Sequence, residues 1–285
     1  MDSRQAKQRS LMAVLAHPDD ETFGMEGTLA LYAKKGVQVH LLCATRGEVG
    51  EADEKILQGF ASVGDLREHE LRCAARKLGL TSVNFLGYRD SGMDGSVDNQ
   101  HTLALMNAPI DKVTSCVVEY FIKLQPQVVI TFDPLGGYLH PDHIAIQKAT
   151  SKAFLLLRLN TSEKSRQAYS PQKLYFHTFP HKFIKFAVKV MPLFGVDPTR
   201  FGRNRDINLL KMVQQDFPIT TRIDYREVAE IRSEAFACHA SQGGGQMSNS
   251  LMGWLERLSY SQDTFMRAYP QPINRKVERD LFEGI

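Results

Sequence analysis

The sequence predicts an α/β protein with a doubly wound, mostly parallel, Rossmann-like sheet and a C-terminal cap or lobe. Two observations predict it. Short apolar runs with β character alternate with amphipathic helical segments, and these helices end at glycines or begin at prolines. The chain of 285 residues is 43% hydrophobic and 24% charged, which is enough to bury one large core.

Each expected element has a local reason. Strands are expected at 10–16, 37–45, 83–86, 127–132 and 173–179. Helices are expected at 25–35, 65–78, 109–124 and 141–157. Gly36 and Gly79 stop the first two helices, whereas Pro109 and Pro141 suit the first turn of the last two. A strand order of 3-2-1-4-5 would place strands 1 and 4 side by side, where such sheets bind ligands.

Polar motifs follow those two strands directly. His17-Pro18-Asp19-Asp20-Glu21 comes after the first, and His140-Pro141-Asp142-His143 lies beyond the fourth. Two histidines and an aspartate form a common ligand set for catalytic zinc, which keeps a further position for water. Helix capping by the aspartates is the plainer interpretation of each motif alone. The pair, at adjacent strand ends, predicts a metal site.

Beyond Pro180 the pattern is less regular. A late strand is expected at 219–223 and a helix at 225–239. We predict a core of residues 1–160 that carries both motifs. Residues 161–285 are expected to complete the sheet and to form a cap over the site.

Charge distribution gives one hint about partners. The net charge is only +3, but residues 151–211 contain 12 Lys and Arg against 3 Asp and Glu. This stretch could attract an anionic substrate or a membrane surface. The plainer interpretation is a solvated face on an insertion. Nothing resembles a nucleic-acid-binding module.

The cysteines Cys43, Cys73, Cys116 and Cys238 show no metal-binding spacing. Their apolar contexts predict buried, reduced thiols and a cytoplasmic location. No apolar run is long enough for a transmembrane segment, and none fits a signal peptide.

The remaining candidates are weaker. His40 is expected in the core and His69 and His101 at the surface. For His239, after a good helix, a position beside the site and a simple helix-end position stay equally open. Glu48 is equally open between the site and an exposed turn.

The two motifs resemble the paired signatures of the LmbE-like (PIG-L) zinc N-deacetylases. Further matching segments are Thr45-Arg46-Gly47-Glu48, Arg67-Glu68-His69-Glu70-Leu71 and Tyr88-Arg89-Asp90-Ser91-Gly92-Met93. Gly136-Gly137-Tyr138 and Cys238-His239-Ala240-Ser241-Gln242 also resemble the branch that acts on mycothiol and its precursors. The resemblance is strong over residues 10–155 and weaker after them.

The resemblance implies a hydrolase that removes an acetyl group from an N-acetylglucosamine-type amino sugar through a zinc-activated water. It implies that His17, Asp20 and His143 hold Zn²⁺ and that Asp19 is the general base. The ligand types also accept other divalent ions, such as Fe²⁺.

The remaining roles also come from the resemblance. Protonated His140 would stabilise the oxyanion, with Asp142 holding it in position. Arg67, Asp90 and Tyr138 would bind the small-molecule substrate, which could be anionic or lipid-linked. An oligomer is compatible with this sequence.

Three other functions stay open. One is an amidase acting on a thiol-cofactor conjugate. Another is an iron(II) oxygenase, since two histidines and a carboxylate also form that enzyme class's ligand triad. The third is a non-catalytic sugar-binding protein with a retained metal site.

Overall fold

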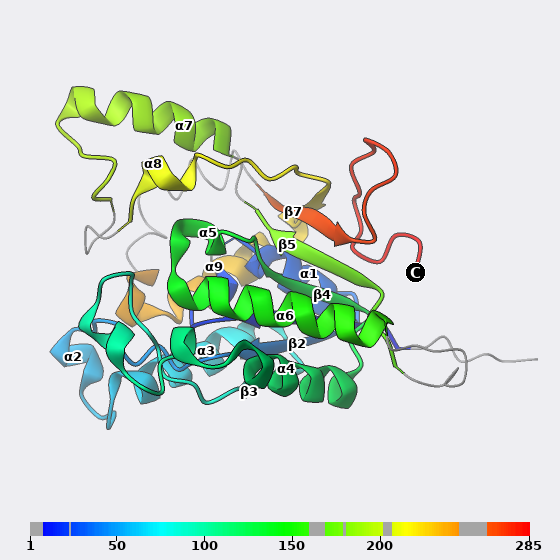
Figure 1. Cartoon of the computed structure of the whole chain (residues 1–285), viewed down its shortest axis with the longest axis horizontal. Helices are drawn as coiled ribbons and strands as arrows, with labels where there is room; N and C mark the ends of the chain where they lie inside the picture. Colours follow the sequence, from blue (N-terminus) through cyan, green and yellow to red (C-terminus); the bar gives the residue numbers. More distant parts are fainter. Residues whose placement is uncertain (1–7, 23, 160–168, 179–180, 202–206, 245–260) are drawn as a thin grey trace, which may run out of the picture.

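A seven-stranded sheet forms the centre of the computed structural model, which describes residues 8–22, 24–159, 169–178, 181–201, 207–244 and 261–285 (Figure 1). The strand order is β3-β2-β1-β4-β5-β7-β6. The strands are β1 Ser10–Leu15, β2 Gln38–Cys43, β3 Ser82–Phe85, β4 Val128–Phe132, β5 Lys173–His177, β6 Thr221–Asp224 and β7 Gln262–Tyr269.

The predicted order of the first five strands is confirmed. These five strands pair in parallel with one another, and β1 pairs with β4 in the register Leu11–Val128 to Ala13–Ile130. The carboxyl ends of β1 and β4 therefore lie together at the point where the strand order reverses. All residues of β1 and β4 are buried, as expected for central strands covered on both faces.

Antiparallel pairing completes the sheet at the β5 edge. β7 pairs antiparallel with both β5 and β6. β6 overlaps the strand expected at 219–223, whereas β7 was not expected from the sequence. The strand is hard to detect from its pattern because it buries the polar residues Asp263 and Thr264. Asp263 can be buried because its carboxylate accepts hydrogen bonds from the backbone N and the hydroxyl of Thr28.

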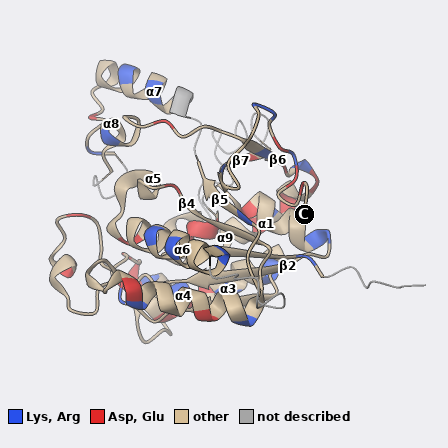
Figure 2. Cartoon of the chain, turned by 45° about the vertical axis from the view of Figure 1, so that its right-hand side comes forward, with Lys and Arg blue, Asp and Glu red and all other residues tan. Residues whose placement is uncertain are grey.

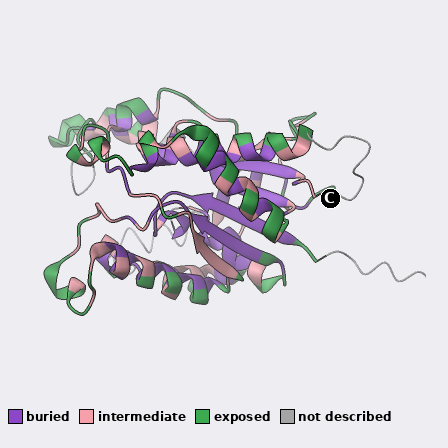
Figure 3. Ribbon diagram, turned by 60° about the horizontal axis from the view of Figure 1, so that its bottom comes forward, coloured by how far each residue is buried: buried purple, intermediate pink, exposed green. Residues whose placement is uncertain are grey.

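Helices cover both faces of the sheet, whose strands form a buried layer in Figure 3. The longer helices are α1 Glu26–Lys34, α3 Val63–Leu78, α4 Ile110–Leu124, α6 Pro141–Leu159, α7 His181–Val190 and α9 Ala229–Ala237. One group of packed helices contains α1, α3 and α9, and α4 packs on α6. In α3, the Ser62 hydroxyl caps the first turn and Gly79, with φ of 74°, ends the helix.

Short helices lie in the connections. They are α2 Glu54–Leu57, α5 Gly136–Leu139 and α8 Leu209–Met212, together with the 3₁₀ turns η1 Asp20–Thr22, η2 Val97–Gln100, η3 Leu105–Asn107, η4 Met191–Phe194, η5 Arg226–Val228 and η6 Ala240–Gln242. In the described chain no helix is both long and apolar enough to cross a bilayer.

The prediction that all four cysteines are reduced is wrong. Cys73 on α3 and Cys238 after α9 form a disulfide, with their Cα atoms 5.8 Å apart. The two residues are 165 positions apart in the sequence and meet because α3 packs against α9. Cys43, which is buried, and Cys116, which is half-buried, are free.

Candidate active site

The two polar motifs meet at the carboxyl ends of β1 and β4. His17 follows β1, and His143 lies in the first turn of α6, beyond β4. The Nδ1 atom of His17 is 3.2 Å from Nε2 of His143, although 126 residues separate them. Both side chains are buried.

Asp20 joins the two histidines. Its Oδ1 lies 3.2 Å from Nε2 of His143, and its Oδ2 lies 3.5 Å from Nδ1 of His17. The same Oδ2 accepts a hydrogen bond of 2.7 Å from the backbone N of His17, which fixes the carboxylate. The structure thus brings together the three residues predicted as metal ligands.

Contacts on three sides orient His143. Its Nδ1 is 3.1 Å from the carbonyl oxygen of Gly136, so a proton on Nδ1 leaves Nε2 free to bind a metal. The ring stacks on Phe132 with centroids 3.9 Å apart. Gly136 has φ of +64°, and a Cβ atom there would lie 2.7 Å from the Cβ of His143. Only glycine fits both conditions.

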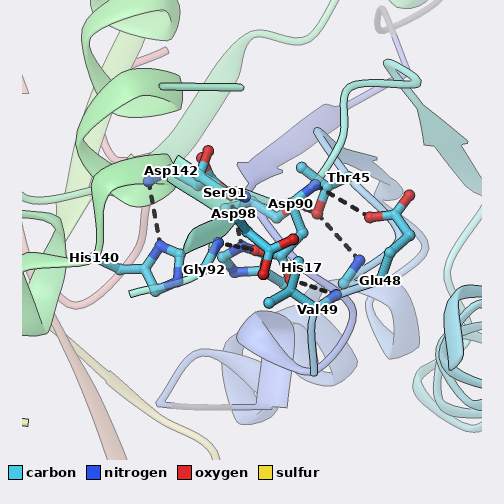
Figure 4. A network of polar contacts seen from close by, with 12 residues as sticks. His17, Thr45, Glu48, Val49, Asp90, Ser91, Gly92, Asp98, His140 and Asp142 are labelled. Atoms are coloured by element: carbon cyan, nitrogen blue, oxygen red, sulfur yellow. Dashed lines mark hydrogen bonds and ion pairs between the residues drawn. The ribbon is translucent and has the colours of Figure 1, made fainter. Parts of the chain in front are cut away.

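The carboxylate of Asp142 holds His17 rather than His140. It lies 3.2 Å from Nε2 of His17 and accepts hydrogen bonds from the backbone N and hydroxyl of Ser91. Figure 4 shows this group with His140, whose Nδ1 accepts a hydrogen bond of 3.2 Å from the backbone N of Asp142. The predicted link between Asp142 and His140 therefore runs through the backbone.

The electrostatics of this group favour a cation. Burial by itself lowers the pKa of His17, but Asp90, Asp142 and Asp20 together raise it well above its usual value. Donor atoms of His17, His140 and His143 lie within 4.8 Å of one another, as do those of His17, Asp90 and Asp142. A buried set of imidazoles and carboxylates at this spacing fits a divalent metal ion.

Asp19 precedes Asp20 in the first motif, and its carboxyl interacts electrostatically with Asp20 and His17. Its backbone has φ of 112°, a left-handed conformation that is uncommon for aspartate and is often found at functional positions. Burial raises the pKa of its carboxyl to about 6, although Arg67 lowers it. A carboxylate with a pKa in this range can take and return a proton near neutral pH.

Arg67 on α3 reaches the same point. Its Nη2 lies 3.2 Å from Oδ1 of Asp19 and donates to the carbonyl of Pro18 at 2.6 Å, and its Nη1 donates to the carbonyl of Gly47 at 3.0 Å. Its Nε is buried and has no hydrogen-bond partner among the described residues. A ligand could satisfy this atom.

Asp90 and Glu48 lie in one network, drawn in Figure 4. Asp90 accepts hydrogen bonds from the backbone N of Gly92 and of Val49, and its Oδ1 is 3.5 Å from Nε2 of His17. Glu48 accepts one from the backbone N of Asp90. Of the two roles left open for Glu48, the network favours the one at the site.

Tyr138 is half-buried and lies against the histidines. Its ring centroid is 5.0 Å from that of His143 and 6.0 Å from that of His140, both in edge-to-face geometry. Burial, followed by the charges of Asp20 and Asp19, raises its pKa, so the phenol stays protonated.

The contacts of two buried glutamates with residues after α9 were not predicted. Glu21 Oε1 lies 2.6 Å from Nε2 of His239, and Glu21 Oε2 accepts from the backbone N of Asp19. Glu70 accepts hydrogen bonds from the backbone N and hydroxyl of Ser241. His239 therefore lies beside the site, as one of its two open interpretations held. In the sequence, the only indication of this contact is that the first motif ends with an acidic residue, Glu21.

The remaining histidines have other surroundings where they are described. His40 is buried and its Nδ1 is 2.8 Å from the Ser82 hydroxyl, whereas His69 and His101 are exposed. His177 is buried, and burial lowers its pKa to about 4. The side chain of His181 lies outside the described residues, as do positions 202–206 of the basic stretch.

Comparison with solved structures supports the fold. The chain is similar to an N,N'-diacetylchitobiose deacetylase from Pyrococcus horikoshii, with a TM-score of 0.60 and 19% identity over 94% of this chain and 88% of that one. It is also similar to a 4-carboxy-2-hydroxymuconate hydratase from Pseudomonas putida, with a TM-score of 0.59 and 18% identity over 94% and 99% of the two chains. These likenesses concern the fold alone, because its members carry out different reactions.

Sequence comparison is more specific. The chain is 34% identical to a 1D-myo-inositol 2-acetamido-2-deoxy-alpha-D-glucopyranoside deacetylase from Acidothermus cellulolyticus, covering 97% of this chain and 95% of the relative. A relative of the same description from Streptomyces avermitilis is also 34% identical, with 97% of each chain covered. The family model described as GlcNAc-PI de-N-acetylase matches residues 12–154, the part that carries both motifs. The chain belongs to this GlcNAc-PI de-N-acetylase (PIG-L) family.

Proposed function

We propose that this protein is a metal-dependent amide hydrolase that removes the acetyl group from an N-acetylglucosamine-type amino sugar. One observation carries the proposal. His17, Asp20 and His143 form a buried cluster with donor atoms 3.2–3.5 Å apart, and the carboxyl of Asp19 is close enough to feel the charges of Asp20 and His17. This arrangement supplies both metal ligands and a separate base.

We assign the metal ligands to His17, Asp20 and His143. Asp20 reaches both histidines with its two oxygens, whereas Nδ1 of His140 already accepts a hydrogen bond from the backbone. A zinc ion held there would supply Lewis-acid polarisation of the scissile carbonyl and a lower pKa for water. Zinc is our proposal for the native metal, although this donor set also accepts Fe²⁺.

Asp19 and His140, which lie around the ligands, have separate roles in the reaction. Asp19 takes a proton from the attacking water and returns it to the leaving amine. Burial, followed by the charges of His17 and His143, lowers the pKa of His140 well below its usual value. We therefore revise the expected protonated His140 to a neutral imidazole. Because its Nδ1 accepts from the backbone N of Asp142, its proton is on Nε2, which can donate to the oxyanion.

Other side chains position these groups or the sugar. Asp142 positions His17 through its contact of 3.2 Å. Arg67, with its unpartnered Nε, and Asp90 are proposed to bind the sugar, and Tyr138 to line the oxyanion side.

The proposed substrate is a glucosaminyl-inositol with an acetylated amine, which is supported by the names of the relatives from A. cellulolyticus and S. avermitilis. The division into residues 1–160 and 161–285, the cytoplasmic location and an oligomeric state remain predictions.

The test is release of free amine by metal-reconstituted protein from N-acetylglucosamine and a panel of its glycosides, including the inositol glycoside. Release that is lost with a chelator and in Asp19→Asn would support a hydrolytic deacetylase. If only thiol-conjugate amides are cleaved, the protein is an amidase of that class. If sugar binds and no amide is cleaved, it is a binding protein with a retained metal site.

A further inference from the structure

We propose that residues 184–201, here called the α7 surface, dock onto an anionic lipid membrane. The segment comprises the described side chains of α7, the η4 turn and the chain that follows it to Phe201. It lies with α8 beyond the edge of the sheet and projects from the body of the molecule (Figure 1). The inference concerns an interaction surface and does not depend on the proposed reaction.

The first observation is the exposure of large apolar side chains. Phe186 is 64% exposed, Leu193 82% and Phe194 78%, and they fall within nine residues of chain. Within the described residues, the exposed phenylalanines all lie in this segment. They are Phe186, Phe194 and Phe201. Such a concentration is uncommon on a surface that meets only water.

The apolar packing between α7 and α8 does not involve these exposed side chains. Val188 on α7 is buried against Leu209 and Met212 of α8, and Ile184 and Met191 are partly buried in the same cluster. The α7 and α8 helices therefore share a small apolar cluster of their own. Phe186, Leu193 and Phe194 lie on the outside of it, free to meet another surface.

Charge selects the partner. The α7 surface carries Lys185, Lys189 and Arg200 and the single acidic residue Asp197. Lys185 pairs with Asp216, and Arg200 interacts electrostatically with Asp197, whereas Lys189 is exposed and has no ion pair within the described chain. Figure 2 shows lysine positions along α7 and on α8. Aromatic and aliphatic side chains beside basic residues on a short helix and turn are typical of segments that lie in the headgroup region of an anionic bilayer.

Tyr138 connects this surface to the catalytic group. It packs against the Val188, Leu209 and Met212 cluster, and its ring contacts His140 and His143. Docking through the α7 surface would therefore hold the Tyr138 side of the site near the lipid–water interface. We infer no transmembrane insertion, because the exposed apolar residues are few.

The test is co-sedimentation of the full-length protein with vesicles of phosphatidylcholine alone or with about 30 mol% phosphatidylglycerol. We expect binding to the anionic vesicles only, weakening with added salt. The variant Phe186→Ser/Leu193→Ser/Phe194→Ser should bind at least about tenfold more weakly, because it removes the inserted apolar area. Lys189→Glu and Arg200→Glu should each weaken binding about fivefold.

Matched controls separate docking from general stickiness. Val97→Ser/Leu103→Ser/Ile273→Ser removes three exposed apolar side chains elsewhere, and Lys112→Glu and Lys148→Glu reverse exposed charges elsewhere. These variants should bind like the unchanged protein. Amine release from a small soluble glycoside and thermal unfolding should remain unchanged in all variants, which shows that each has folded.

Three results would overturn the proposal. One is no binding to anionic vesicles. Another is equal loss of binding in the control variants. The last is vesicle binding that depends on Lys189 and Arg200 and not on Phe186, Leu193 and Phe194, which would indicate electrostatic adsorption without docking of the apolar side chains.

Discussion

Arg67 and Asp19 face each other at the start of the first motif, with Nη2 of the arginine 3.2 Å from Oδ1 of the aspartate. The contact is not an isolated ion pair, because carbonyl oxygens of Pro18 and Gly47 also bind the guanidinium. The arginine thus joins the Asp19 carboxylate to the backbone of Pro18 and of Gly47. It fixes the place at which Asp19 can exchange a proton.

Replacement of Asp19 by asparagine tests this carboxylate as the base. Asp19→Asn keeps the shape of the side chain but cannot accept a proton, so we expect turnover to fall at least about 100-fold. Metal content and thermal stability should stay close to those of the unchanged protein. Amine release at a third or more of the original rate would remove Asp19 from the mechanism.

Gly47 provides an indirect test of Arg67. A Cβ atom at Gly47 would lie 2.2 Å from Nη1 of Arg67, so Gly47→Ala must displace the guanidinium. We expect kcat to fall at least about tenfold because the groups around Asp19 lose their positions. Gly36→Ala is the matched control, since Gly36 also has a positive φ, of +78°, but nothing within 4 Å of its Cβ position. Both variants pay a backbone cost of about 1 kcal/mol, and only Gly47→Ala should lose activity. Equal activities would mean that Arg67 does not position the base.

Metal removal should affect both activity and stability. Carboxylates and imidazoles crowd together around His17, so an ion that binds the folded state stabilises it. At a concentration 100 times Kd the gain is about 2.7 kcal/mol. We expect a chelator to lower Tm and abolish amine release, and added zinc to restore both. His143→Ala should start from the lower Tm and respond little to the chelator. A Tm that ignores the chelator in the original protein would argue against a bound metal.

The meeting of the two polar motifs could be predicted from the sequence because it follows a topological rule. The apolar runs of β1 and β4 predicted neighbouring parallel strands, and His17 and His143 therefore had to converge. The structure places their nitrogens 3.2 Å apart. The contact of Asp142 with His17 could not be predicted in this way, because it depends on the direction of one side chain and on Ser91 in a distant loop.

Long-range pairs in the second half of the chain were harder to predict. Cys73 and Cys238 meet only because α9 returns to pack on α3, and nothing local in either helix indicates that return. β7 was missed for a related reason. From the sequence alone, an aspartate such as Asp263 is expected at the surface. In the structure it is buried because Thr28, on α1, donates two hydrogen bonds to its carboxylate.

The Cys73–Cys238 disulfide should stabilise the packing of α3 against α9. Cross-linking residues 165 positions apart restricts the unfolded chain, and reduction should cost about 2–4 kcal/mol of unfolding free energy. Thiol titration in denaturant should find two free thiols before reduction and four after it. Cys238→Ser should match the reduced protein, whereas the free, half-buried Cys116 can be changed to serine as a control with little effect. Four titratable thiols without reductant would show that the bond does not form.

Asp263 should make the protein less stable as pH rises. Burial, followed by the charge of Glu26, raises its pKa from 3.8 to about 8. The folded state therefore binds a proton more tightly than the unfolded chain does. That contribution is fully present below about pH 4 and is lost as the pH rises to about 8. We expect the unfolding free energy of the original protein to fall between pH 5 and pH 8, with a slope of at most about 1.4 kcal/mol per pH unit from this group. Asp263→Asn can still accept the two hydrogen bonds from Thr28 and carries no charge, so its stability should depend less on pH.

Denaturant unfolding of both proteins at matched metal concentration, at pH 5, 6, 7 and 8, measures the difference directly. Comparing the two proteins cancels the titration of the metal site, which both share. The control is Asp111→Asn, at a side chain that is 79% exposed, whose curve should run parallel to that of the original protein. If the Asp263→Asn curve also runs parallel, Asp263 keeps its charge in the folded protein. The hydrogen bonds from Thr28 would then outweigh the cost of burying that charge.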